Sequence, residues 1–182
     1  MPRCASPTPS IARLGPDSRA LECQAASLSD DAPARGAERT RRDHADDHVI
    51  SINNTTQIDL QGQAASESDG HRHISGTGGQ LQFVRSAYAS KGGKSFICLT
   101  STYDKRGERR SRIVLNLTPG NVVTTPRSDV MFVVTEYGMV NLKGKSVAER
   151  AKALIGIAHP DFREDLERQA YEHRLIPRGV SF

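Results

Sequence analysis

A glycine-rich loop is the feature of this sequence whose residue types point most directly to chemistry. Ser75-Gly76-Thr77-Gly78-Gly79-Gln80 follows a region of predicted strands and opens a segment with helical periodicity. Such a loop offers backbone N–H groups and the positive end of a helix dipole to an anion, and glycine lets a ligand approach closely. It is not a dinucleotide-binding fingerprint, because Leu81 stands where a third glycine is required. The loop is therefore either a ligand-binding turn or a tight turn before a helix.

A second set of candidates comprises a donor for a developing oxyanion and two carboxylates. Asn53 stands at the end of a predicted strand, where its amide could donate an N–H to a developing oxyanion. The alternative is an Asx turn. Glu67 and Glu136 are candidate carboxylates, but neither has an evident partner in the sequence. We expect Glu67 to lie in a solvated loop.

Two other motifs only partly match known binding sites. Gly93-Lys94-Ser95 ends like a phosphate-binding loop, but Tyr88 occupies the place of that motif's first glycine and a strand is predicted to follow. His71 and His73 could ligate a metal from an extended segment, but no third ligand is evident, so no metal site is predicted. His159 precedes a proline and is expected to cap a helix.

Composition excludes several classes of protein. The 182 residues carry a net charge of +4 with no tryptophan, and the basic residues are scattered without a base-reading motif. Nucleic acid is therefore not the expected partner, and the positive bias suits anionic phosphates equally well. The sequence has no run of 18 apolar residues and no secretory signal, so we expect no membrane contact and a cytoplasmic location. Cys98 lies in an apolar run and is expected to be a buried core thiol.

The chain divides into two parts by composition. Residues 1–47 are rich in Ala, Arg, Asp, Ser and Pro and have almost no aliphatic pattern, whereas residues 49–182 carry nearly all of the aliphatic side chains. We expect residues 1–47 to be a disordered tail, or non-native sequence from a shifted frame or misplaced start. Residues 49–182 are expected to form one domain.

The expected domain is an α/β fold, a layered open sheet with flanking helices. Helices are predicted over residues 80–90, 146–158 and 160–173, the second with a capping box of Ser146 and Glu149. Residues 95–101 are mostly apolar, which predicts a strand covered on both faces. Further strands are predicted over residues 49–52, 57–60, 112–117, 122–123, 131–134 and 137–140, with a charged turn at 104–110.

Seven sequence blocks occur in an order that is characteristic of a known family. They are Ser51-Ile52-Asn53-Asn54 with Ile58-Asp59-Leu60-Gln61-Gly62, Ile74-Ser75-Gly76-Thr77-Gly78-Gly79-Gln80, Ser90-Lys91-Gly92-Gly93-Lys94-Ser95, Thr124-Thr125-Pro126-Arg127, Val133-Val134-Thr135-Glu136-Tyr137-Gly138, Leu142-Lys143-Gly144-Lys145-Ser146 and Ala158-His159-Pro160-Asp161-Phe162-Arg163. The series resembles the C-terminal domain of the acetyl-CoA hydrolase/transferase family, above all its 4-hydroxybutyrate and butyryl-CoA:acetate CoA-transferases. The resemblance covers residues 49–182.

The resemblance implies CoA transfer between a short-chain acyl-CoA and a carboxylate such as acetate, by a ping-pong reaction through a glutamyl-CoA thioester. It implies that Asn53 and Gly76 contact CoA or the thioester oxygen and that Gly78 and Gly79 shape the loop. CoA would be a substrate, with no further cofactor. The family's nucleophilic glutamate and CoA-binding glycine loop lie upstream, and nothing in residues 1–47 resembles them.

The resemblance therefore implies an N-terminal domain as partner, and a homo-oligomer for the intact enzyme. Two alternatives remain: a non-catalytic CoA-binding module, or an inactive truncated fragment. One small departure from the family is Ser86, which stands where members usually have glycine.

Overall fold

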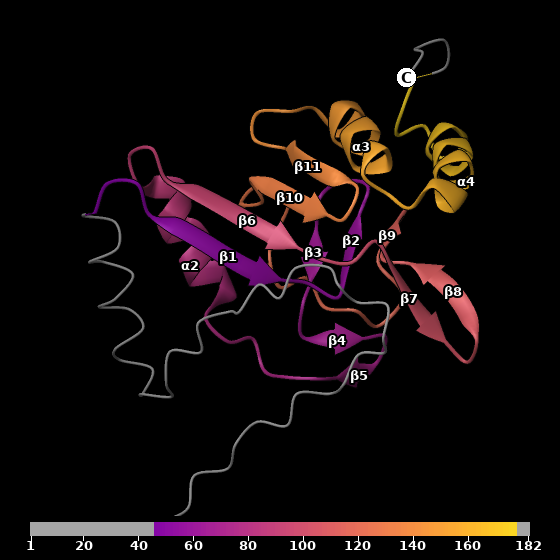
Figure 1. Cartoon of the computed structure of the whole chain (residues 1–182), viewed down its shortest axis with the longest axis horizontal. Helices are drawn as coiled ribbons and strands as arrows, with labels where there is room; N and C mark the ends of the chain where they lie inside the picture. Colours follow the sequence, from indigo (N-terminus) through magenta and orange to yellow (C-terminus); the bar gives the residue numbers. More distant parts are fainter. Residues whose placement is uncertain (1–45, 178–182) are drawn as a thin grey trace, which may run out of the picture.

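The computed structural model describes residues 46–177. Apart from Asp46 and Asp47, the expected tail of residues 1–47 lies outside the described residues. The strands are β1 (Ile50–Asn54), β2 (Gln57–Asp59), β3 (Ala64–Ala65), β4 (Ser68–Asp69), β5 (Arg72–His73), β6 (Lys94–Cys98), β7 (Thr102–Lys105), β8 (Glu108–Ser111), β9 (Ile113–Val114), β10 (Phe132–Thr135) and β11 (Gly138–Asn141). The helices are α2 (Gln80–Ala89), α3 (Val147–Gly156) and α4 (Pro160–Glu172) (Figure 1). The expected mixture of strands and helices in an α/β fold is confirmed.

The main sheet has four strands in the order β1-β6-β10-β11. β1, β6 and β10 are parallel, whereas β11 pairs antiparallel with β10 at the edge. The strand ends are joined at one side, since the amide of Thr55 donates to Cys98 and that of Leu99 donates to Val134. The carboxyl ends of three strands therefore share one edge of the sheet.

The two faces of this sheet differ in their cover. Ser51, Ser95, Ile97 and Val133 are buried on the face against which α2 packs. On the opposite face the side chains of β6 are only half-buried, and β1 exposes Ile50 and Ile52. The expectation that residues 95–101 are covered on both faces is therefore wrong, because the described residues place no helix over the second face (Figure 1).

Smaller sheets complete the fold. β2 lies between β3 and β9, and β4-β5 and β7-β8 are antiparallel hairpins. A single hydrophobic core joins this part to the main sheet and to α3 and α4, with fully buried Ile58, Leu60, Ile113 and Leu154 among its members. β2 is buried at all three positions, including Asp59, whose carboxylate accepts the amides of residues 61 and 63.

The helices follow the sequence closely. α3 begins after Ser146, whose hydroxyl accepts from the Glu149 amide while the Glu149 carboxylate accepts from Ser146, so the predicted capping box is confirmed. α4 begins after His159, whose side chain accepts from the Asp161 amide, so the predicted capping role is also confirmed. Within the described residues no helix has both the length and the apolar character to cross a membrane.

Three local expectations are wrong. Residues 104–110 are not merely a charged turn but most of the β7-β8 hairpin, which turns at Arg106 and Gly107 with φ of 57° and 81°. Positive φ at both central residues is typical of a tight hairpin turn. Val122 and Val123 lie outside any strand and are 39% and 40% exposed. Cys98 is half-buried instead of buried, because its side of the sheet is uncovered.

Candidate functional site

The glycine-rich loop connects β5 to α2 and lies on the surface. Gly76 and Gly78 are exposed, and a methyl group built on either would meet nothing within 4 Å. Gly78 has a φ of +59°, which side-chain-bearing residues rarely adopt, so glycine is required there for the turn. Gly79 is the N-cap of α2, and a methyl group there would lie 3.1 Å from the ring of Phe83.

The N-terminus of α2 has the properties of an anion-binding site. No side chain caps it, and its first turn carries no acidic residue. The first amides of a helix have no partner inside the helix, and the dipole there favours negative charge. Gln80 is fixed by a hydrogen bond of 3.0 Å from its Nε2 to Thr125 Oγ1, so the start of the helix is attached to the body of the fold.

Asn53 lies on the face of β1 that α2 covers, in register with buried Ile97. Its side chain is half-buried, and its Nδ2 donates to Ser51 Oγ at 2.8 Å. A carboxamide has two N–H donors, so this contact orients the amide and uses one of them. The Asx turn that was the alternative is not formed, since the amide bonds within the strand.

The sheet brings Asn53 and the glycine-rich loop to the same region. α2 runs back along β1 and β6, so its N-terminus lies toward the end where β1 finishes (Figure 1). Asn53 is the penultimate residue of β1 and is on the α2 side. The Asn53 amide and the first backbone amides of α2 therefore lie toward the same end of the main sheet.

Glu136 lies at this same edge, directly after β10. Its carboxylate accepts the Ser101 amide at 2.9 Å and the Ser101 hydroxyl. The expectation that Glu136 has no partner is therefore wrong. The partner was missed because it lies 35 residues away and only the parallel pairing of β6 and β10 brings it near.

Glu67 was expected to be solvated but is buried. It is only 7% exposed, and its Oε2 is buried without a hydrogen-bond partner among the described residues. Glu67 is therefore not a solvated loop residue. Its backbone carbonyl accepts the amides of Ile74 and Ser75, so the residues on either side of the β4-β5 hairpin are joined at Glu67. Those two bonds also fix the beginning of the glycine-rich loop.

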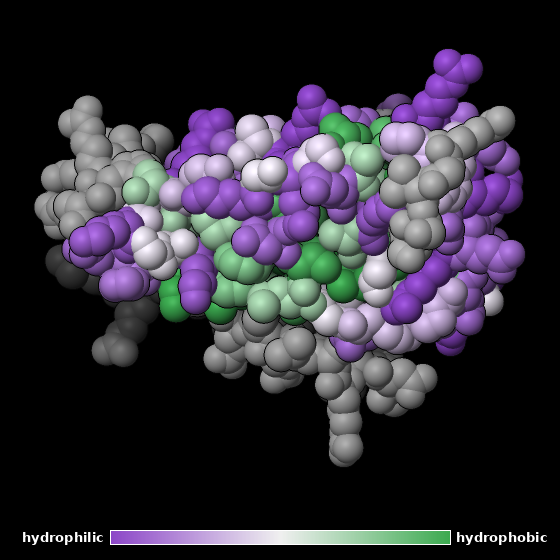
Figure 2. All heavy atoms as spheres, turned by 90° about the horizontal axis from the view of Figure 1, so that it is seen from above, coloured by the Kyte–Doolittle hydropathy of each residue, from purple (hydrophilic) through white to green (hydrophobic). Residues whose placement is uncertain are grey.

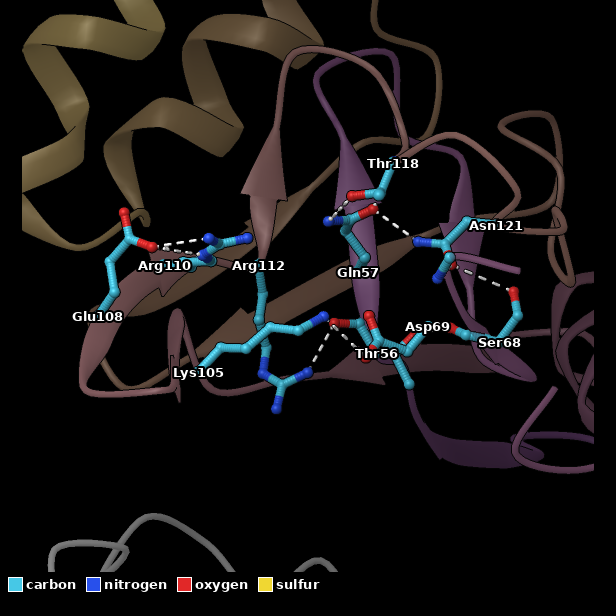
Figure 3. A network of polar contacts seen from close by, with 11 residues as sticks. Thr56, Gln57, Ser68, Asp69, Lys105, Glu108, Arg110, Arg112, Thr118 and Asn121 are labelled. Atoms are coloured by element: carbon cyan, nitrogen blue, oxygen red, sulfur yellow. Dashed lines mark hydrogen bonds and ion pairs between the residues drawn. The ribbon is translucent and has the colours of Figure 1, made fainter. Parts of the chain in front are cut away.

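A polar network holds this hairpin in place (Figure 3). Gln57 exchanges hydrogen bonds of 2.8 and 2.9 Å with Thr118, and its Oε1 also accepts from Asn121. Asn121 Oδ1 in turn accepts the Gly70 amide at 2.6 Å, and Ser68 Oγ accepts the Val122 amide. The network engages the backbone around residue 122, which explains why no strand forms there.

Basic side chains gather beside the network. The guanidinium of Arg112 donates to the Thr56 carbonyl at 2.8 Å and lies over the ring of Tyr103, and burial lowers the pKa of Arg112. Lys105 pairs with Asp69 at 3.6 Å (Figure 3). These cations hold the β7-β8 hairpin against β4, and their charges are paired with groups of this chain.

The predicted site residues thus fall into two groups. Asn53 lies on the face of β1 that α2 covers and Gly79 is the N-cap of that helix, whereas His71 and His73 are exposed in the β4-β5 hairpin. In residues 46–177 no three His, Cys, Asp or Glu side chains are grouped as a metal site would need. Sequence reasoning did not find the contact of Ser101 with Glu136, and no local pattern signals it.

Known proteins resemble this chain along most of its length. The family model of the acetyl-CoA hydrolase/transferase C-terminal domain matches residues 34–170. A butyryl-CoA:acetate CoA-transferase of Anaerostipes caccae is 52% identical over 134 residues, which is 73% of this chain and 30% of that protein. A 4-hydroxybutyrate coenzyme A transferase of Clostridium kluyveri is 53% identical over 120 residues, 66% of this chain and 28% of its own.

Solved structures give the same result. RipA from Yersinia pestis matches with a TM-score of 0.64 and 46% identity, covering 75% of this chain and 29% of that one. A 4-hydroxybutyrate CoA-transferase from Porphyromonas gingivalis matches with a TM-score of 0.57 and 38% identity, covering 74% and 29%. This chain therefore spans about 30% of the length of the curated relatives it matches. It belongs to the acetyl-CoA hydrolase/transferase family and contains that family's C-terminal domain.

Proposed function

We propose that this chain acts as the C-terminal part of an acyl-CoA:carboxylate CoA-transferase, exchanging CoA between a short-chain acyl-CoA, such as butyryl- or 4-hydroxybutyryl-CoA, and acetate. The observation that supports the proposal is the 52% identity of this chain to a butyryl-CoA:acetate CoA-transferase, together with an Asn53 amide on the face of β1 that α2 covers. Coenzyme A is the substrate, and no other cofactor is needed.

The reaction uses a glutamate carboxylate supplied from outside this chain. The carboxylate attacks the thioester carbonyl, CoA thiolate leaves, and a mixed anhydride forms. The thiolate then attacks the glutamyl carbonyl and releases the first carboxylate, which leaves a glutamyl-CoA thioester. The incoming carboxylate reverses these steps and departs as the new acyl-CoA. Covalent catalysis divides one difficult transfer into easier steps.

This chain contributes the donors for those steps. Each attack places negative charge on a carbonyl oxygen, and donors already fixed in position stabilise it without reorganisation. The Asn53 amide is oriented by Ser51, and the amides around Gly76 lie on an open surface where a thioester can approach. The positive end of α2 adds to the same field.

The test has two arms. In the first, CoA binding to the purified chain is measured by calorimetry, and binding is expected. In the second, butyryl-CoA is incubated with labelled acetate, first with the chain alone and then with the preceding part of the Anaerostipes caccae enzyme added. We expect exchange only in the mixture. A chain that neither binds CoA nor restores exchange would refute the proposal, and turnover by the chain alone would refute an external nucleophile.

A further inference from the structure

Three basic side chains gather near the turn that follows β2. We call Arg127, Lys143 and Arg150 the cation cluster. Arg127 Nη1 donates to Gln61 Oε1 at 2.8 Å, and Arg150 Nη1 donates to the Arg127 carbonyl at 2.6 Å. A methyl group built on Gly62, whose φ is +93°, would lie 3.0 Å from Arg150 Nη1. Both guanidinium groups therefore contact the Gln61-Gly62 turn, and glycine leaves the room that Arg150 occupies.

Lys143 reaches the same region from the turn that follows β11. Its ammonium group lies 3.9 Å from the ring centroid of Tyr88, which belongs to the last turn of α2. The phenol of Tyr88 is also close enough to Arg150 to act on the pKa of that guanidinium. Tyr88 is therefore a neighbour of both cations, and the cluster draws on four separate segments of the chain.

Arg150 is buried without an opposite charge. Its exposed fraction is 9%, and its Nε and Nη1 atoms donate to the carbonyls of Lys145 and Arg127. Carbonyl oxygens satisfy hydrogen bonds but carry no net charge, whereas a buried charged side chain is normally paired with an opposite charge. Burial and the positive charge of Arg127 both lower the pKa of Arg150, as a local shortage of negative charge requires.

The carboxylates nearest in sequence are engaged elsewhere. Asp129 pairs with Arg85 at 3.1 Å, and the Glu149 carboxylate accepts from the amide and hydroxyl of Ser146. Among residues 46–177 no ion pair joins a carboxylate to any member of the cation cluster. Arg150 also stands in the first turn of α3, where the helix dipole disfavours a cation. An anion bound at the cluster would relieve both repulsions.

Phosphate is the anion whose chemistry fits these side chains. A guanidinium group binds two phosphate oxygens through parallel N–H···O bonds, and an ammonium group adds a compact charge. Arg127 and Lys143 are exposed, so a ligand has access from solvent. Figure 2, seen from the side on which α3 lies in Figure 1, shows hydrophilic side chains over much of that face. We propose that the cation cluster is a binding site for a phosphate group.

Two kinds of molecule carry such a group: a free phosphorylated anion and the nucleotide end of CoA. α2 connects the cluster with the glycine-rich loop, because Gln80 at its start bonds to Thr125 and Tyr88 near its end lies under Lys143. A helix of ten residues is about 15 Å long, a distance that one extended ligand spans. The inference rests on the proposed function only if CoA is the source of the phosphate.

The experiment titrates the whole chain with inorganic pyrophosphate at an ionic strength held constant with sodium chloride. Calorimetry measures binding, and thermal melts measure the stabilisation that a ligand of the folded state produces. Arg127→Gln and Lys143→Gln each remove one charge of the cluster at an exposed position. Arg168→Gln is the matched control, because Arg168 is exposed on α4 and paired with Asp165 and Glu172. Circular dichroism verifies that all variants are folded.

We expect pyrophosphate to bind the wild type and Arg168→Gln equally well. Each cluster variant loses a charged hydrogen-bond donor and should bind at least about tenfold more weakly. Pyrophosphate should raise the melting temperature of the wild type and of the control, but not that of the double variant Arg127→Gln/Lys143→Gln. No binding to the wild type, equal binding by the cluster variants, or equal weakening by Arg168→Gln overturns the inference.

A titration with CoA in saturating pyrophosphate identifies the source of the phosphate. If pyrophosphate competes with CoA, and the cluster variants weaken binding of CoA but not of pantetheine, the cluster holds the nucleotide end of CoA. If CoA binds independently of pyrophosphate, the cluster holds a free anion. Both results support a phosphate site. A chain that binds pyrophosphate through the cluster but neither binds CoA nor restores exchange refutes the proposed function and leaves this inference standing.

Discussion

Ser101 donates two hydrogen bonds to the carboxylate of Glu136, one from its amide at 2.9 Å and one from its hydroxyl. Ser101 follows β6 and Glu136 follows β10, so the pair ties together the carboxyl ends of two neighbouring parallel strands. Ser101 is fully buried whereas Glu136 is exposed. A carboxylate is thereby held in a fixed position at the edge where β1 ends, one residue after Asn53.

Replacing Ser101 by alanine should weaken this attachment. The amide bond remains, but the hydroxyl donor to a charged group is lost, so we expect the free energy of unfolding to fall by about 1–2 kcal/mol. Urea denaturation measures the change. Thr77→Ala in the exposed glycine-rich loop is the control and should leave the midpoint unchanged. An equal midpoint for Ser101→Ala and the control would contradict a stabilising role for the contact.

The capping box of α3 predicts a dependence of stability on pH. Hydrogen bonds from the side chain and amide of Ser146 lower the pKa of Glu149. A carboxyl whose folded pKa is lowered contributes stability that is present above its unfolded pKa and lost as the pH falls through the folded value. Glu149→Ala should therefore melt below the wild type at neutral pH, and this difference should shrink at acid pH, below the ordinary carboxyl range.

Thermal melts followed by circular dichroism from pH 7 to pH 3 measure that difference. Ser146→Ala removes the hydroxyl bond to Glu149 and should cost about 1 kcal/mol at neutral pH. In the Ser146→Ala variant, replacing Glu149 by alanine should therefore change the pH dependence of the melting temperature less than it does in the wild type. If the difference in melting temperature between Glu149→Ala and the wild type stays constant with pH, the capping hydrogen bonds of Glu149 are not its cause.

Ser86 predicts a stabilising substitution. It lies in α2 facing the sheet, is 1% exposed, and its Oγ has no hydrogen-bond partner in the described residues. Ser86→Ala removes the desolvated hydroxyl and improves helix propensity, so the free energy of unfolding should rise by about 1 kcal/mol. Ser90→Ala is a matched control of opposite sign, because the Ser90 hydroxyl donates to the Asp46 carbonyl and accepts the Val49 amide. Destabilisation by Ser86→Ala in urea would contradict the prediction.

Local signals in the sequence predicted the helices well. The apolar residues of α3 repeat with a helical period directly after its cap, Ser146, and those of α4 do so directly after its cap, His159. Both helices can therefore be located without tertiary information. The β7-β8 hairpin was missed for a related reason. Its strands are charged instead of apolar, and its remaining signal is the Arg106-Gly107 turn.

Features that depend on distant neighbours could not be predicted in this way. Glu67 has an ordinary polar sequence context, and its burial arises from the fold of the β4-β5 hairpin. The apolar run around Cys98 indicated a strand, but a run of apolar residues does not distinguish cover by this chain from cover by another segment. Asn53 is a candidate by its type and position, whereas the hydrogen bond to Ser51 that orients its side chain is visible only in the structure.

Asn53 gives the prediction that bears most directly on the reaction. In the mixture of this chain with the preceding part of the Anaerostipes caccae enzyme, Asn53→Ala removes the side-chain donor that we propose for the developing oxyanion. Loss of such a donor typically lowers kcat by about 100- to 1000-fold. Labelled acetate exchange with butyryl-CoA measures kcat and KM, and thermal melts verify that loss of the bond to Ser51 leaves the fold intact.

The adjacent residue is the matched control. Asn54 has the same side chain and is exposed on the opposite side of β1, so Asn54→Ala should change kcat little. A transition-state donor lowers kcat and kcat/KM together, whereas a group that only binds CoA raises KM and leaves kcat unchanged. A large fall in kcat for Asn53→Ala, but not for Asn54→Ala, therefore identifies the oxyanion role. Rates within a few-fold of the wild type for both variants would exclude it and leave the amides of the glycine-rich loop as the donors to test.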